Sequence, residues 1–195
     1  MRTRLLDATV DCLVKYGYSG TTTPRIAEMA GVTRGAQVHH FGSREDLLLA
    51  AVEHLALKRM SAAVPRFGEG VTKSADLIGT LLDIAWDLHG DEYFIPVVEL
   101  WVAGRTDPAL GKQVARFEVS VVINLTAAVA EFLPEEIHKP MLEFIYLAMD
   151  ALRGILIASL VDTDPSRARR RWDRAAPGLR RSVSPALADW IAARE

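Results

Sequence analysis

Helical spacing of apolar residues is the feature that most constrains how this chain can fold. Apolar side chains recur at intervals of three and four residues along most of its length, and no segment alternates apolar and polar residues as a half-buried strand does. One such stripe consists of Leu6, Val10 and Leu13. The pattern predicts an all-α protein.

Proline, glycine and capping residues divide the periodic segments into separate helices. Thr23-Pro24 is a typical helix start, with Thr23 as the N-cap and Pro24 as the first helical residue, and Ser43 is another start. Gly17 and Gly31 are typical ends. Residues 66–72, which follow Pro65, are expected to form a loop. Beyond a first helix that ends at Gly17, helices are predicted over about 23–30, 33–40, 44–64, 74–89, 93–104, 108–132, 135–161, 165–182 and 186–193.

Composition excludes several other classes of protein. The chain has 195 residues, half of them hydrophobic, so it can bury a core without disulfides, and its one cysteine, Cys12, excludes an intramolecular disulfide. The apolar stretch 145–161 is interrupted by Asp150 and Arg153, which is too polar for a membrane span. The charged N-terminus has no apolar secretory segment, so the cytoplasm is the expected compartment.

The N-terminal residues have the pattern of a helix-turn-helix. Ala27 is small enough to let the next helix cross closely, and Gly31 can adopt the left-handed conformation of a sharp turn. Val32 is expected to pack inside the corner, and Thr33 to cap the following helix. In this motif the second helix lies in the major groove of DNA and presents its first residues to base edges.

At these residues the chain resembles the DNA-binding domain of the TetR family of transcriptional regulators, over about residues 4–52. Order, spacing and residue type agree over one long window, which a lone helix-turn-helix pattern would not achieve. Weaker similarity to the family's C-terminal domain appears at residues 99–108 and 150–154. The matching N-terminal segments are Tyr16-Gly17-Tyr18, Thr21-Thr22-Thr23, Ile26-Ala27, Ala30-Gly31-Val32-Thr33, Gly35-Ala36, His39-His40-Phe41 and Ser43-Arg44-Glu45-Asp46-Leu47.

The resemblance implies two domains and a set of DNA contacts. Residues 1–48 would form the DNA-binding domain, and residues 49–195 an effector-binding and dimerisation domain. The chain departs from the family at Gln37, whose amide can read adenine, and at Val38, which cannot donate to phosphate. The predicted DNA-binding residues are Thr22, Thr23, Thr33, Arg34, Gly35, Gln37, His39, His40 and Arg44.

Aromatic residues of the larger domain are candidates for an effector pocket, although each alone is more typical of core packing. Asn124 lies in an apolar run, where a buried amide needs a partner: a ligand, a neighbouring helix or water. The predicted ligand-binding residues are Trp86, Phe94, Trp101, Phe117, Asn124 and Tyr146.

The resemblance implies that two C-terminal helices, over about 135–161 and 165–182, pair with their copies as a four-helix interface in a homodimer. The first is apolar on most faces and must be covered. A two-fold dimer would place two recognition helices one DNA turn apart on a palindromic site. The arginine-rich patch 167–181 is interpreted as ion-paired across the dimer or as a solvated face, with nucleic-acid or acidic-lipid binding as the alternative.

These patterns together predict a transcriptional regulator of the TetR type, a repressor released from double-stranded operator DNA by a small, largely apolar effector. The alternative is a helical carrier or sensor of hydrophobic ligands that binds no operator. Neither an enzymatic activity nor a cofactor is expected. Glu135 and His138 have the spacing of a di-iron ligand pair, but a bundle site needs a second such pair, which the sequence lacks.

The net charge of −2 conceals an uneven distribution. Residues 1–48 hold six Lys+Arg against five Asp+Glu, residues 49–164 hold nine against seventeen, and residues 165–195 hold eight against three. The faintly basic DNA-binding segment predicts weak non-specific binding and an affinity that depends strongly on the operator.

Overall fold

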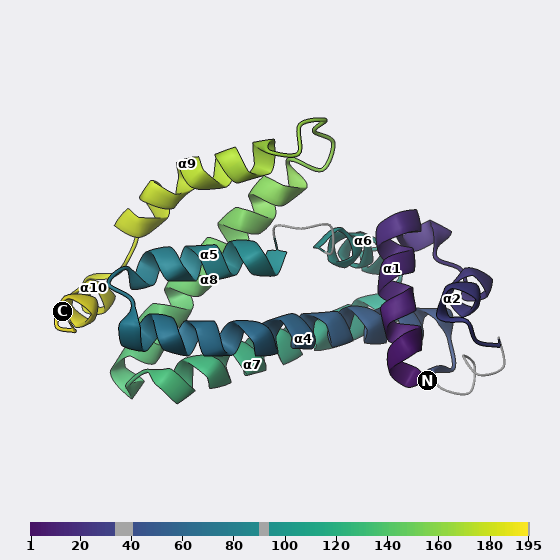
Figure 1. The fold of residues 1–195 in the computed structure, drawn as a ribbon, viewed down its shortest axis with the longest axis horizontal. Coiled ribbons are helices and arrows are strands. Elements are labelled where there is room, and N and C mark those ends of the chain that lie inside the picture. The colour runs from purple at the N-terminus through teal and green to yellow at the C-terminus, as the bar shows by residue number, and fades with distance from the viewer. Residues whose placement is uncertain (34–40, 90–93, 195) are drawn as a thin grey trace. The chain divides into compact units, whose positions relative to one another are not determined.

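The computed structural model describes residues 1–33, 41–89 and 94–194, which form helices joined by turns and loops, with no strand among them (Figure 1). This confirms the all-α class. The first and longest helices are α1 (Arg2–Gly20), α4 (Arg44–Lys73), α7 (Pro108–Phe132) and α8 (Glu135–Ile157). The shorter helices are α2 (Thr23–Ala30), α5 (Leu77–His89), α6 (Phe94–Gly104), α9 (Arg167–Arg181) and α10 (Pro185–Ala192).

The chain divides into two compact units. The first contains Met1–Arg59 and Glu92–Val122, and the second contains Met60–Asp91 and Ile123–Glu195. Both α4 and α7 pass from one unit into the other along the chain. The boundary predicted after residue 48 separates DNA binding from effector binding, whereas these units are defined by compactness alone. That functional boundary stays a prediction.

The core of the first unit forms where α1 packs against α2 and α6. The predicted stripe of α1 is buried, since Leu6, Val10 and Leu13 are at most 5% exposed. The start of α4 adds Leu47 and Leu48, which are fully buried. The same core includes Leu5, Cys12, Ile26, Ala51, Val52, Leu100, Leu110, Val114 and Phe117.

The second unit is organised around α8, which packs against α5, α9 and α10. Met141 and Leu152 of α8 are completely buried. α9 is docked through Trp172, which is 1% exposed, and Leu179. Leu187 anchors α10 in the same way.

The prediction of a loop over residues 66–72 is wrong, because α4 continues through Pro65 to Lys73. Pro65 removes one helical hydrogen bond, but the glycines that follow permit close packing. A Cβ on Gly68 would lie 2.5 Å from Cε1 of Phe132. The neighbouring Phe67 ring meets Phe132 edge to face, with centroids 5.8 Å apart. Tertiary packing therefore outweighs the low helix propensity of this stretch.

Candidate nucleic-acid interface

The turn that ends α2 has the geometry of a helix-turn-helix corner. Gly31 is left-handed, with φ 61° and ψ 41°. Its N–H donates to the carbonyl of Glu28, and the N–H of Val32 donates to that of Ala27, both at 3.0 Å. These two bonds form a Schellman motif, and the half-buried Val32 packs against the core of the first unit. The roles predicted for Gly31 and Val32 are confirmed.

The start of α2 differs by one residue from the sequence prediction. Thr22 is the N-cap and Thr23 is the first helical residue, whereas Thr23 was expected to be the cap. The Thr22 side chain makes no capping hydrogen bond and is exposed. The first N–H groups of α2 therefore have no side-chain cap, which suits a position that faces phosphate.

Most residues predicted to read DNA lie outside the described part of the chain. This applies to Arg34, Gly35, Gln37, His39 and His40. Thr33, the last residue before that segment, is exposed.

Arg44, predicted to contact phosphate, is engaged within the protein. Its Nε donates to the carbonyl of Thr21 at 2.7 Å, its Nη2 donates to the carbonyl of Tyr18, and its Nη1 pairs with Glu45 at 2.9 Å. The guanidinium also lies 4.6 Å from the centroid of the Tyr18 ring. Arg44 thus ties α4 to the end of α1, and its contact with phosphate stays a prediction.

Replacing Arg44 with alanine is expected to destabilise the first unit. The side chain is only 23% exposed, and its loss leaves two carbonyls without their charged donor. Hydrogen bonds to charged groups contribute about 1.5–3 kcal/mol, so chemical denaturation should show a loss of that order. Arg174→Ala, on an exposed surface of α9, is the control and should change stability little. Unchanged stability of Arg44→Ala with a reduced salt dependence of DNA binding would instead assign Arg44 to phosphate.

Other cations of the first unit are structural in ways that the sequence did not suggest. Arg4 donates to the carbonyl of Ala30 at 2.6 Å, at the end of α2. Arg25 donates to the carbonyl of Gly20 and lies 4.1 Å from the centroid of the Tyr16 ring. Neither contact follows from sequence spacing, because each joins a residue of α1 to a residue of α2.

The predicted effector-binding residues fall into both units. In the first unit, Phe94 and Trp101 meet edge to face at 5.7 Å, Trp101 donates to Glu118 at 2.9 Å, and Phe117 is buried in the core. In the second unit, Trp86 lies 5.0 Å from the Arg169 guanidinium. Asn124 and Tyr146, also of the second unit, are half-buried. Contact of these residues with a ligand stays a prediction.

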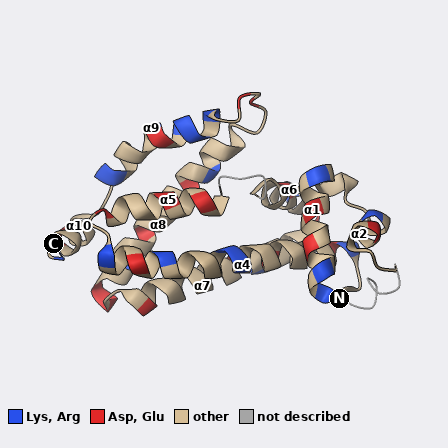
Figure 2. Ribbon diagram, in the orientation of Figure 1, with Lys and Arg blue, Asp and Glu red and all other residues tan. Residues whose placement is uncertain are grey.

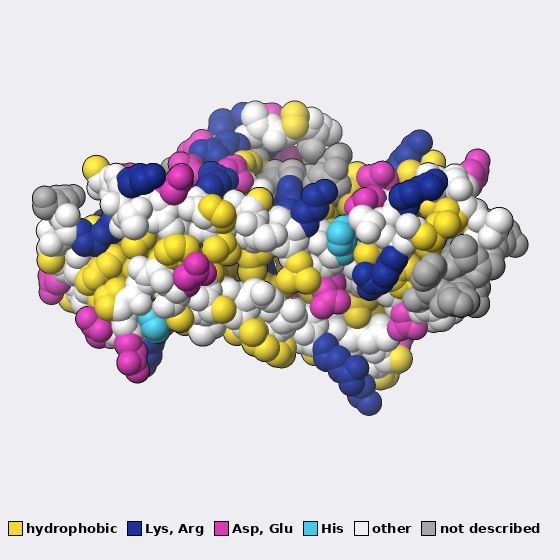
Figure 3. All heavy atoms as spheres, turned by 60° about the horizontal axis from the view of Figure 1, so that its bottom comes forward, with side chains coloured by type: hydrophobic (Ala, Val, Ile, Leu, Met, Phe, Trp, Pro, Cys, Tyr) yellow, Lys and Arg dark blue, Asp and Glu magenta, His cyan; other side chains and the backbone are white. Residues whose placement is uncertain are grey.

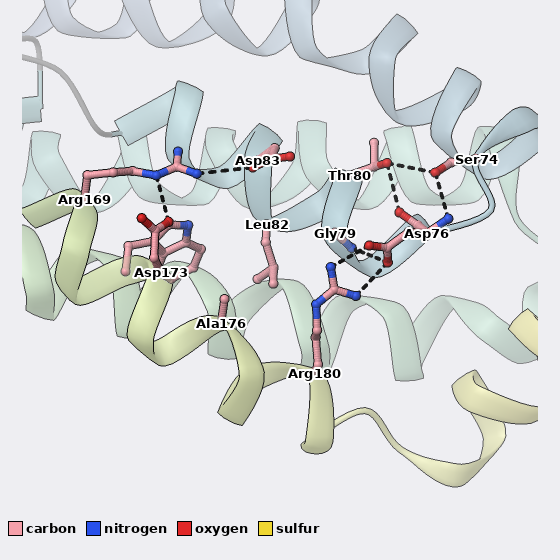
Figure 4. Close-up of a pocket in the computed structure, with 11 residues that line it drawn as sticks. Ser74, Asp76, Gly79, Thr80, Leu82, Asp83, Arg169, Asp173, Ala176 and Arg180 are labelled. Atoms are coloured by element: carbon pink, nitrogen blue, oxygen red, sulfur yellow. Dashed lines mark hydrogen bonds and ion pairs between the residues drawn. The ribbon is translucent and has the colours of Figure 1, made fainter.

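A cleft of about 250 Å³ lies between α5 and α9, and Figure 4 shows that charged side chains cross it. Arg180 reaches Asp76 with both Nη atoms, at 2.7 and 2.6 Å, and holds the pKa of that carboxyl below its usual range. Arg169 pairs with Asp173 at 2.8 Å and approaches Asp83 at 3.7 Å. None of the predicted effector residues lines this cleft.

The arginine-rich patch is largely ion-paired inside the second unit, and Figure 2 shows acidic residues in α9 and in the loop before it. Besides the pairs across the cleft, Arg167 binds Asp162 at 2.9 Å and Arg170 binds Asp164 at 2.5 Å. Arg171 donates to the carbonyl of Ala158. These pairs lie within one chain, so ion pairing of the patch across a dimer stays a prediction.

One described helix, α7, is long and apolar enough to meet the composition of a membrane span. The core helix of a soluble protein passes the same test, and three residues of α7, Leu110, Val114 and Phe117, are buried in the core of the first unit. Exposed apolar side chains are not evidence of a membrane span either, because the face of the molecule in Figure 3 shows them interspersed with charged side chains. Length and composition alone therefore do not make α7 a span.

An all-α chain whose N-terminal helices end in this corner belongs to the class of helix-turn-helix DNA-binding regulators. The family model of bacterial regulatory proteins of the tetR family matches residues 5–51. The chain is 28% identical over 178 residues to the HTH-type transcriptional regulator CymR of Pseudomonas putida, covering 86% of this chain and 83% of CymR. These matches support the assignment of the chain to the TetR family of transcriptional regulators.

Further comparisons agree with this assignment. The repressor AcnR of Corynebacterium glutamicum is 33% identical over 107 residues, which are 55% of this chain and 52% of AcnR. Among solved structures, the multidrug binding protein EbrR in complex with malachite green aligns with a TM-score of 0.63 and 19% identity, over 94% of this chain and 98% of EbrR. At that identity the structural match shows the fold alone.

Proposed function

We propose that the protein is a repressor that binds palindromic operator DNA as a homodimer and is released by a small, largely apolar effector. The observation that carries this proposal is the corner at Gly31 and Val32, which directs the chain from α2 into the segment expected to enter the major groove. Residues 1–48 would bind DNA, residues 49–195 would bind the effector and dimerise, and the protein would act in the cytoplasm.

Selection of bound fragments from a random or genomic DNA library tests the DNA-binding step. We expect a palindromic motif whose half-sites are centred about 34–36 Å apart. Gel shifts on that motif should be sequence-selective and should weaken steeply with salt. Absence of selective binding at low salt would contradict operator recognition and favour the helical carrier of hydrophobic ligands.

Replacing Gln37 with alanine is expected to relax the base preference at one position in each half-site. A bidentate contact of the amide with adenine contributes about 1–3 kcal/mol of discrimination. Repeating the DNA selection with Gln37→Ala measures this effect, and the affinity for unrelated DNA should stay unchanged. An identical motif for both proteins would exclude Gln37 from base reading.

Homodimerisation is supported by an uncovered face of α8. The large apolar side chains of Leu147 and Ile157 are each 45% exposed, so they are available for contact with a second chain. Between them, Gly154 is exposed, and a Cβ placed there would meet nothing within 4 Å. The seven-residue spacing of Leu147 and Gly154 puts them on one face, where a second helix can approach closely.

Effector binding is supported by the aromatic side chains of α6 and α7, where Phe94, Trp101 and Phe117 cluster within the first unit. Trp86, Asn124 and Tyr146 are separate candidates for ligand contact within the second unit. An effector lowers operator affinity only if it binds the DNA-incompetent state more tightly. Tryptophan fluorescence titrations, with malachite green and ethidium as first probes because EbrR binds them, measure ligand affinity with and without operator.

A further inference from the structure

Glu99 is the single charged residue of α6 and lies on the side of that helix that meets α1. Its Oε2 accepts a hydrogen bond from the backbone N–H of Tyr18. The residues beside it, Val98 and Leu100, are buried and apolar. A half-buried carboxylate in such surroundings is costly unless a donor compensates for its lost water.

Gly17 makes this contact possible. It has φ 67° and ψ 178°, which interrupts the helical backbone of α1 immediately before Tyr18. A Cβ on Gly17 would lie 3.0 Å from Oε1 and 3.3 Å from Oε2 of Glu99, so a larger residue would crowd the carboxylate. The interruption presents the Tyr18 N–H as an available donor, and Glu99 supplies its acceptor.

The carbonyl of Tyr18 is held from the opposite direction. It accepts from Arg44, whose Nε also donates to Thr21. Arg44 is the first residue of α4 and follows the segment expected to read DNA by four residues. Glu99, Tyr18 and Arg44 therefore form a continuous connection from α6 to the start of α4.

A separate contact fixes the same start of α4 from α7. Asp46 accepts from Gln113 at 2.8 Å, and its own N–H donates to the Ser43 hydroxyl at 3.0 Å. Bonds to Ser43 and Gln113 lower the pKa of the Asp46 carboxyl. With α4 supported on this side, the contact from Glu99 sets how its first residues lie against α1.

We infer that Glu99 is a positioning residue for DNA binding. Its bond to Tyr18 fixes Arg44 and thereby the first residues of α4, which follow the segment expected to read DNA. The inference rests on the proposed operator binding.

Two substitutions separate the hydrogen bond from the charge. Glu99→Ala removes both, whereas Glu99→Gln removes the charge and keeps an oxygen that can accept from Tyr18. Removing a negative charge should by itself strengthen DNA binding. Positioning predicts the opposite for Glu99→Ala, a loss of about tenfold or more in operator affinity, and a substantial recovery in Glu99→Gln.

Operator affinity is measured by fluorescence anisotropy on the selected motif, with full-length protein and after correction for the folded fraction. Glu118→Ala is the matched control, because Glu118 binds α6 through Trp101 and has no bond to α1. It should lower stability and, because it too removes a negative charge, leave operator affinity unchanged or slightly higher. The Tyr18 amide resonance should move in Glu99→Ala and not in Glu118→Ala.

The outcomes are distinguishable. If the wild-type protein selects no operator, the proposed function fails. If the wild-type protein binds its operator and folded Glu99→Ala binds equally well or better, the positioning role is overturned. A weakened Glu99→Ala that Glu99→Gln does not recover assigns the effect to charge and also overturns the role of the hydrogen bond.

Discussion

A glutamate in place of Gly154 is expected to yield a folded monomer that has lost operator affinity. The site is exposed and open, so a larger side chain meets nothing within its own chain. Glycine also weakens a helix interior by roughly 0.5–1 kcal/mol relative to alanine, so the substitution does not weaken α8 itself. Two copies of a charged side chain would, however, meet across the proposed two-fold interface without partners.

The loss of affinity should be large because a dimer binds both half-sites at once. Linking two binding modules raises the overall affinity by about 10²–10⁴ over a single module. Light scattering would report the mass in solution, and anisotropy on the selected operator would report the affinity. Gly154→Ala is the matched control and should remain dimeric. A dimeric Gly154→Glu with native affinity would place the interface elsewhere.

Replacing Trp172 with alanine is expected to be the most destabilising of the substitutions considered. Trp172 is 1% exposed and, with Leu179, provides the buried contacts of α9. Large-to-small substitutions of buried aromatic residues cost about 3–5 kcal/mol, which is a large part of the typical stability of about 5–15 kcal/mol. Urea denaturation followed by circular dichroism measures this loss.

The ion pairs of α9 provide the comparison for Trp172. Arg180 and Asp76 form a bidentate pair, but their side chains are 43% and 58% exposed. Exposed pairs contribute about 0–1 kcal/mol, so Arg180→Ala should have a small effect. If Arg180→Ala were as damaging as Trp172→Ala, the ion pairs and not the buried ring would hold α9 in place.

The acid response of this pair has a definite sign. Arg180 lowers the pKa of Asp76 in the folded protein, so the pair stabilises the fold above the ordinary carboxyl pKa. That contribution is lost as the pH falls through the lowered value. Asp76→Asn should therefore flatten the acid side of the stability profile.

Local patterns were sufficient to predict most of the helices. Apolar periodicity placed the buried stripe of α1, and Gly31 marked the end of α2 because a left-handed residue is needed there. The same reasoning failed at Gly68, where glycine serves close packing against Phe132 instead of a turn. Glycine alone cannot distinguish these uses, because the second depends on a residue far along the chain.

The candidate site was less predictable from the sequence for the same reason. Similarity to a family identified Arg44 but gave its role as a phosphate contact, whereas in the structure its guanidinium donates to the carbonyls of Tyr18 and Thr21. The bond from Tyr18 to Glu99 joins residues 81 positions apart. Such contacts arise from how the helices meet, which local periodicity does not determine.

The buried Cys12 makes this protein convenient for measurements of distance in solution. Its side chain is fully buried, its thiol donates to the Met29 sulfur, and burial raises the pKa of the thiol, so little reactive thiolate is present. A cysteine introduced at exposed Ser19 could then carry a spin label at one position per chain. In the proposed homodimer, double electron–electron resonance between the labels of the two copies would report the separation of the DNA-binding domains, with and without ligand.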